Sequence, residues 1–349
     1  EVLRKALSNK RADEHVLRYR EEFIAGAMAK GVKRRVAERV FAQLQAFGGY
    51  AFPKSHAAAF AVLTYQSAWL RCYYPAAFFA ALLRHQPMGF YPPHIIVSEA
   101  RRCGIEIRPV DVEHSSARAI VEGGALRLGL GIVTGLGDAG GQQVVEARRF
   151  GPFRSLADFC RRTKLARPAI EALIWAGAFD SWGLPRRQLV WDLQAAIEAA
   201  QGPPPLALPA APQERPRFGF LSPRGRLWAE VAHTGVAASA HLTTLASDGL
   251  RRMGVTPSRG LPDLPDGCKV WVGGVVASAQ RPPTAGGVAF LALEDEGGLI
   301  NVVLKPEIYE ASRKALRSPI VVVEGVLQRR GQALNILARK VLALEVDPV

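Results

Sequence analysis

The pattern of apolar and polar residues is helical through the first 120 positions of the chain. A helical stretch covers residues 57–83 and is broken at Pro75, which cannot continue a helix. Residues 104–110 alternate in polarity before the chain turns, which predicts one short strand. Upstream of both, apolar residues recur three or four positions apart, and the clearest set is Val36, Val40, Phe41, Leu44 and Phe47.

Glycine turns and one proline-rich segment organise the middle of the chain. Residues 121–201 have the pattern of short helices separated by glycine turns. Proline dominates residues 202–216, so this segment is expected to be a stiff, extended linker and a domain boundary. Residues 217–266 form a connecting segment with no clear pattern beyond a helical stretch near 242–253.

From Cys268 onward the pattern is that of strands. A helix is expected at 307–316, between the third and fourth of five strands at 269–276, 288–293, 299–304, 320–327 and 334–344. This order is typical of a small OB-type barrel, a fold that binds single-stranded nucleic acid on one face. The acidic turn Glu294–Glu296 is interpreted as a solvated hairpin tip.

The charge balance indicates a polyanionic partner. Lysine and arginine total 45 against 31 acidic residues, a formal net charge of +14. Each basic side chain placed on a phosphate releases condensed counterions, which favours binding. Charge alone leaves DNA, RNA and an acidic membrane surface open. No apolar run approaches the ~20 residues of a membrane span, so no membrane partner is expected.

The start of the chain and its cysteines indicate a cytoplasmic protein. The sequence begins without a methionine or a signal-peptide pattern, which is typical of a fragment or a processed chain. The four cysteines form neither CxxC pairs nor zinc-ligand spacing; they are Cys72, Cys103, Cys160 and Cys268. We therefore expect reduced thiols and no metal bound by this chain.

A glycine-rich segment at residues 135–140 matches the GxGxxG pattern of dinucleotide sites. Such a site needs a second strand ending in an acid about 20 residues later, and here that region begins a helix. A helix–hairpin–helix fits better, with Leu130, Val133 and Leu136 facing the core. A tight turn between packed helices, with no ligand, is the alternative.

The DNA contacts expected from this motif lie on the hairpin and the helix after it. Glycines let the hairpin backbone approach a phosphate, and a helix N-terminus offers free N–H groups. Contacts of this kind read no sequence. A second unit is expected at residues 165–180, where a helix begins at a proline. The expected contact residues are Gly135, Gly137, Asp138, Gly140, Arg148 and Arg149.

Single-strand contacts are expected on the barrel. Trp271 and Phe290 are candidates for stacking on bases, and arginines on the last strands for tracking the backbone. These arginines are Arg329, Arg330 and Arg339. Rim charge without a ligand is the alternative. Residues 188–193 loosely resemble a sliding-clamp peptide, although their helical spacing favours a partly buried role for Leu189, Trp191 and Leu193.

Three stretches carry a family resemblance: residues 49–60 (GYAFPKSHAAAF), 65–70 (YQSAWL) and 74–78 (YPAAF). Together they resemble the fingers domain of bacterial C-family DNA polymerases, the alpha subunits of DNA polymerase III and their error-prone relatives. The resemblance extends over nearly the whole chain. Residues 126–180 resemble the family's tandem helix–hairpin–helix region, and residues 270–344 resemble its OB domain.

Within the family, the chain is more similar to the error-prone, ImuC-type branch. Replicative members usually have Asn where Pro53 stands, and the error-prone branch shares residues 86–91 (QPMGFY). The chain also stops just after the OB-like region, whereas replicative members continue into a domain that binds the clamp loader. A fragment of a replicative alpha subunit and a non-catalytic nucleic-acid-binding module are the alternatives.

The resemblance implies a multidomain fold class, with mostly α-helical fingers and a tandem helix–hairpin–helix region followed by a small all-β OB-fold barrel. The implied divisions are fingers at 1–120, helix–hairpin–helix units at 121–201, a linker at 202–216, a connecting segment at 217–266 and the barrel at 267–349.

The resemblance also implies contacts to the incoming nucleotide. Arg4 and Lys5 correspond to cationic residues that meet the triphosphate, where positive charge offsets the charge that builds during phosphoryl transfer. The nucleotide-facing motif corresponds to Tyr50, Lys54, Ser55 and His56. The alternative is a plain helix start, with Ser55 as a cap and His56 as a structural histidine.

The family's catalytic carboxylates are not expected in this chain. In the family, palm carboxylates hold two metal ions and lie upstream of the matched region. The sequence has no Asp-x-Asp pair, so the chain alone is expected not to polymerise. Mg²⁺ and dNTP are expected for the complete polymerase. The implied partners are primer-template and single-stranded DNA, the sliding clamp and an inactive Y-family-like mutagenesis protein, in DNA repair and damage-induced mutagenesis.

Overall fold

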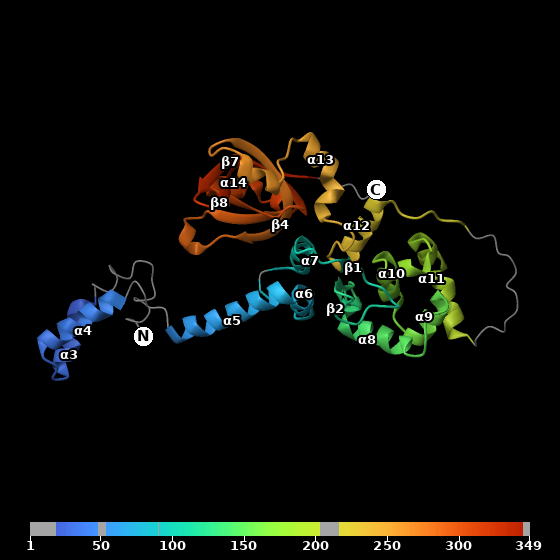
Figure 1. Ribbon diagram of the computed structural model, residues 1–349, viewed down its shortest axis with the longest axis horizontal. Helices are drawn as coiled ribbons and strands as arrows, with labels where there is room; N and C mark the ends of the chain where they lie inside the picture. Colours follow the sequence, from blue (N-terminus) through green and yellow to red (C-terminus); the bar gives the residue numbers. More distant parts are fainter. Residues whose placement is uncertain (1–18, 48–53, 90, 203–215, 345–349) are drawn as a thin grey trace. The chain divides into compact units, whose positions relative to one another are not determined.

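The structure, a computed structural model, describes residues 19–47, 54–89, 91–202 and 216–344 (Figure 1). Contacts divide the chain into two units, Glu1–Trp69 and Leu70–Val349. The expected residues Arg4, Lys5 and Tyr50 lie outside the described ranges, as do Pro53 and most of the proline-rich segment.

In the first unit, α3 (Arg20–Ala29) and α4 (Arg34–Phe47) pack against each other. Ile24 and Phe41 are buried between them, and the Phe23 and Phe41 ring centroids lie 5.6 Å apart. The helix predicted from the spacing of Val36, Val40 and Phe41 is present. Phe41 is buried, whereas the two valines are 38% and 39% exposed.

Helix α5 (Lys54–Tyr73) is apolar around its whole circumference rather than along one stripe. Phe60, Val62 and Leu63 are each more than half exposed. The predicted break at Pro75 is confirmed, since α6 (Pro75–Arg84) begins there. Among the described residues, no helix combines the length and the apolar character that crossing a membrane requires.

A small three-stranded sheet, in the order β1-β3-β2, follows α7 (Pro93–Arg102) in the chain. The expected strand near residue 107 is β1 (Ile107–Arg108), which pairs in parallel with β3 (Ala125–Arg127). Sequence reading missed β2 (Ile120–Glu122), which pairs with β3 across the turn Gly123–Gly124. Both glycines have positive φ, 57° and 84°, which such a two-residue turn requires.

The helical region has a core of edge-on aromatic rings. The Phe159 ring, fully buried, lies 4.9 Å from both Phe153 and Phe179, and Phe179 lies 4.8 Å from Trp182. The elements around this core are η1 (Leu130–Ile132), α8 (Gly137–Arg148), α9 (Leu156–Thr163), α10 (Arg167–Trp175), η2 (Asp180–Trp182) and α11 (Arg186–Gln201).

The connecting segment packs on two cores at once. Val236 and Ala238 belong to the core of the helical region, whereas Ala246 packs against Val275 and Ile320 of the barrel. The Thr134 N–H also donates to the His233 carbonyl (2.7 Å). The segment's elements are α12 (Pro223–Thr234), η3 (Leu242–Ala246), α13 (Ser247–Arg252) and η4 (Ser258–Asp263).

The C-terminal strands form a closed five-stranded barrel, as predicted. Its order is β4-β5-β6-β8-β7, with β6 and β8 parallel and all other pairs antiparallel. The expected helix between the third and fourth strands ends early and continues as a 3-10 turn. The elements are β4 (Lys269–Gln280), η5 (Pro283–Ala285), β5 (Ala289–Glu294), β6 (Leu299–Leu304), α14 (Pro306–Ser312), η6 (Ala315–Arg317), β7 (Ile320–Arg330) and β8 (Ala333–Ala343).

The interpretation of Glu294–Glu296 as a solvated hairpin tip was wrong for two of the three residues. Glu294 has no exposed surface, and Asp295 is 9% exposed. Both carboxylates are bonded to groups outside the barrel, which explains how charged residues are tolerated there.

The aromatic core predicts a large difference between two phenylalanines of the helical region. Phe159→Ala removes a fully buried ring and is expected to lower the free energy of unfolding by about 3–5 kcal/mol. Phe150 is 88% exposed, so Phe150→Ala should change it by less than about 0.5 kcal/mol. Urea unfolding of both variants tests this, and equal effects would contradict the assigned core.

Candidate nucleic-acid interface

The predicted hairpin is an exposed turn leading directly into α8. Gly135 and Gly137 have φ of 78° and 64°, and a side chain at either would meet no atom within 4 Å. Leu130, Val133 and Leu136 are buried beneath the turn, as predicted. The backbone is therefore accessible, and the first N–H groups of α8 are available to an anion such as a phosphate.

A hollow of about 490 Å³ adjoins this hairpin. It is lined by Arg84, Arg118 and Gln142, together with the predicted residue Asp138. Arg118 Nε lies 2.7 Å from Asp138 Oδ2, and both side chains are more than half exposed. Sequence reading missed the two arginines, because they come from α6 and from the loop before β2.

The other residues predicted on this motif divide into buried and exposed ones. Gly140 is buried, and a Cβ there would lie 2.6 Å from the Leu136 side chain, so it serves close packing. Arg148 donates from Nη1 to the Val112 and Ser115 carbonyls (2.9 and 3.0 Å).

Burial lowers the pKa of Arg148 below its ordinary value, and nearby Glu113 and Asp111 oppose this only in part. The guanidinium of Arg148 therefore holds the loop that contains Val112 and Ser115. The adjacent Arg149 is exposed.

On the barrel, Phe290 is 42% exposed and points outward from β5. It pairs with Gln280 on one side and Val303 on the other. Two residues further along β5, Ala292 pairs with Asn301, which in turn pairs with Asn335 on β8. An exposed ring thus lies beside polar amides on the β5–β6–β8 face, a combination suited to stacking and hydrogen bonding with bases.

Trp271 is not brought together with Phe290. The strand positions of Trp271 and Gln280 on β4 differ by nine residues, and Gln280 is the residue that pairs with Phe290. Trp271 pairs instead with Glu324 on β7, which pairs with Lys340. The two aromatic residues therefore belong to different parts of the barrel surface.

The three predicted arginines on the barrel also differ in their surroundings. Arg329 Nη2 donates to the Pro262 and Leu264 carbonyls (2.7 and 3.2 Å), so it anchors η4. Arg330 is exposed at the end of β7. Arg339 is exposed where the β7–β8 register shifts, an irregularity that can redirect a side chain.

The nucleotide motif is only partly described. Ser55 and His56 are exposed in the first turn of α5, which begins at Lys54. The His56 ring lies 4.4 Å from the Phe60 ring. Their predicted nucleotide contacts stay predictions.

Within the described ranges, no group of three or more His, Cys, Asp or Glu side chains is arranged to hold a metal ion. Cys160 is buried, which raises the pKa of its thiol to about 11 and keeps it protonated. In the clamp-like segment, Leu189 and Leu193 are core residues, as interpreted, whereas Trp191 is 60% exposed and lies 5.8 Å from the Phe218 ring.

Two family models match the regions built above. Residues 104–189 match a helix–hairpin–helix motif, and residues 270–344 match an OB-fold nucleic acid binding domain. The predicted fold class is confirmed by these matches and by the closed barrel.

Curated relatives match the chain from end to end. An error-prone DNA polymerase of Anaeromyxobacter sp. (strain K) is 39% identical over 368 residues, covering 99% of this chain and 32% of the relative. Another from Mycolicibacterium paratuberculosis is 40% identical over 343 residues, covering 97% of this chain and 31% of the relative. The chain is homologous to the error-prone DNA polymerases.

The chain spans about a third of the length of the relatives it matches. The family resemblance predicted from the sequence is confirmed. Among solved structures, asparaginyl-tRNA synthetase from Pyrococcus horikoshii aligns with 27% of this chain and 23% of its own, at 24% identity and a TM-score of 0.23.

The two adjacent arginines at the C-terminal end of α8, Arg148 and Arg149, give a matched prediction. Arg148→Ala leaves two carbonyls without their donor and should lower the free energy of unfolding by about 1–3 kcal/mol. Arg149→Ala should leave it within about 0.5 kcal/mol. If Arg149 meets a phosphate, its loss should reduce the slope of log affinity against log salt by about 0.9. Urea unfolding and DNA binding at several salt concentrations separate these effects, and a stability loss only in Arg149→Ala would refute the assignment.

Proposed function

We propose that this chain handles DNA and the incoming nucleotide within an error-prone DNA polymerase. The observation that carries the proposal is the joint presence of two accessible surfaces, the glycine hairpin and the β5–β6–β8 face, in a chain homologous to polymerases of that name. The names of the relatives favour the error-prone branch over a replicative subunit.

The hairpin supports binding to the sugar-phosphate backbone. Its exposed glycines and the start of α8 present N–H groups, with Arg118 beside them. Such groups match phosphate oxygens of any sequence, which a polymerase requires because it moves along every template.

The barrel supports binding to the unpaired template strand. Phe290 offers a ring face to a base, and Asn301 and Asn335 follow in register on the neighbouring strands. Arg339 and Arg330 add exposed positive charge for the backbone. Bases stack on aromatic rings with little preference for sequence, which suits damaged templates.

Nucleotide contact is proposed at the start of α5 on the basis of the family resemblance. Lys54, Ser55 and His56 fall in the first turn of that helix, and Arg4, Lys5 and Tyr50 complete the motif by resemblance. Mg²⁺ and dNTP would be bound by the complete polymerase. A sliding clamp and a Y-family-like mutagenesis protein are proposed as partners on the same basis.

The proposed single-strand surface predicts a specific loss. Phe290→Ala should weaken binding to a fluorescent oligothymidine by about 5-fold to 150-fold, the range of one base–aromatic stack. Phe220→Ala, which removes another exposed ring outside the barrel, should leave binding unchanged. Fluorescence anisotropy across a salt series measures both. Absence of binding by the unmodified chain at low salt would overturn the proposed DNA-binding function.

Catalysis is proposed to depend on residues that this chain does not contain. With primer-template, dNTPs and Mg²⁺, the chain alone should give no primer extension, because the sequence has no Asp-x-Asp pair to hold two metal ions. A denaturing gel measures this, with a complete polymerase as positive control. Template-dependent incorporation by this chain would contradict the proposal.

A further inference from the structure

We propose that the Arg102–Glu294 ion pair is a positioning pair that holds the OB barrel on helix α7, so that the hairpin and the barrel bind one DNA molecule as a single two-part surface. The inference rests on the proposed function. It concerns residues that touch no DNA in that proposal.

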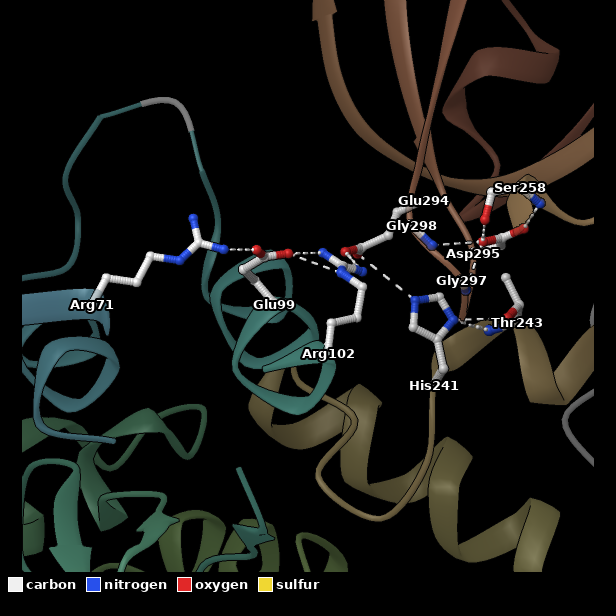
Figure 2. A network of polar contacts seen from close by, with 10 residues as sticks. All are labelled: Arg71, Glu99, Arg102, His241, Thr243, Ser258, Glu294, Asp295, Gly297 and Gly298. Atoms are coloured by element: carbon white, nitrogen blue, oxygen red, sulfur yellow. Dashed lines mark hydrogen bonds and ion pairs between the residues drawn. The ribbon is translucent and has the colours of Figure 1, made fainter. Parts of the chain in front are cut away.

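Glu294 is the most deeply buried acid of the barrel. It ends β5 with no exposed surface, and its Oε1 accepts from Arg102 Nη1 at 2.7 Å (Figure 2). Arg102 comes from α7, far away in the sequence, and its side chain is 16% exposed. A carboxylate buried in this way requires a charged or multiply hydrogen-bonding partner, and here that partner lies outside the barrel.

Arg102 is itself held in place by a chain of ion pairs (Figure 2). Its Nε and Nη2 donate to Glu99 Oε2 at 2.8 and 2.6 Å, and Glu99 also pairs with Arg71 at the end of α5. Burial alone lowers the pKa of Arg102, but its hydrogen bonds to Glu294 and Glu99 outweigh this, and the net shift is upward. Glu99, which lies on the same helix, thus fixes the orientation of the guanidinium toward the barrel.

Among the residues that the structure describes, no other group donates a hydrogen bond to the Glu294 carboxylate. His241 Nε2 is 3.7 Å from Glu294 Oε2, and His241 Nδ1 lies 2.7 Å from Thr243 Oγ1. Glu294 Oε2 has no hydrogen-bond partner among the described residues. His94 lines the same cavity of about 420 Å³, and burial lowers the pKa of its imidazole. Arg102 therefore supplies the hydrogen-bonded positive charge.

The next residue forms a second attachment from the same turn. Asp295 accepts from the N–H groups of Gly297 and Gly298 (2.8 and 3.0 Å) and from the Ser258 N–H at the start of η4 (2.6 Å) (Figure 2). Two consecutive buried acids are therefore each bonded to a different element outside the barrel. Removal of one partner leaves the other buried and unpaired, so the attachment is specific to this geometry.

A fixed attachment matters because two linked sites bind one ligand more tightly than either site does separately. The gain depends on the effective concentration of the second site, which falls when the connection is loosened. Loosening the pair should therefore weaken binding only to DNA that occupies both surfaces.

The test uses the full chain carrying Glu294→Gln or Arg102→Lys, with three DNA probes. These are a short oligothymidine, a blunt duplex and a primed template with a single-stranded overhang. We expect affinity for the first two to stay within twofold, and affinity for the primed template to fall by about tenfold or more. The matched control is Arg251→Gln, which breaks an ion pair between Arg251 and Asp248 at the surface. The side chains of these two residues are 76% and 71% exposed. It should behave like the unmodified chain.

Hydrogen exchange provides the second readout. Glu294→Gln should speed exchange at the end of α7 and in the β5–β6 turn, whereas Arg251→Gln should not. Should Glu294→Gln fail to fold, Glu99→Gln releases Arg102 without altering the barrel and should give the same selective loss. Equal losses on all three probes, or no loss on the primed template, would overturn the inference. Failure of the unmodified chain to bind any probe would instead refute the proposed function.

Discussion

A buried carboxylate needs a partner, and this constraint decides how the barrel is joined to the rest of the second unit. Glu294 and Asp295 are adjacent at the end of β5 and are almost fully shielded from solvent. Arg102 and Ser258, from two separate elements, supply the partners. The desolvated charges tolerate few alternative arrangements, so a turn between two strands also serves as an attachment point.

The same reasoning applies to the arginines of the chain. Arg101, Arg148 and Arg329 each donate to two backbone carbonyls. These groups contribute to the net charge of +14, and hence to long-range attraction of a polyanion. They are not placed for direct phosphate contact. Exposed residues such as Arg149 and Arg339 are better suited to that role.

Sequence reasoning predicted the elements whose signal is local. The five barrel strands follow from alternating polarity between turns, and the hairpin follows from glycines flanked by Leu130, Val133 and Leu136. The Gly123–Gly124 turn carried an equally local signal for the β2–β3 hairpin, which was overlooked among predicted helices.

The rest depends on contacts between residues distant in the sequence. Burial of Glu294 depends on Arg102, and the hollow beside the hairpin depends on Arg84 and Arg118. Neither contact follows from a regular spacing of residue types along the sequence. The nucleotide motif came from family resemblance, because spacing around Ser55 and His56 describes a plain helix start equally well.

The most direct test of the account is hydrogen exchange of the chain with and without a primed template. The account predicts protection on DNA binding in two separate segments, the hairpin with the start of α8 and the β5–β6–β8 face around Phe290. Protection in both segments would support a two-part DNA surface. Tight binding that protects neither segment would contradict the account, because the DNA would then lie on a surface other than the two described.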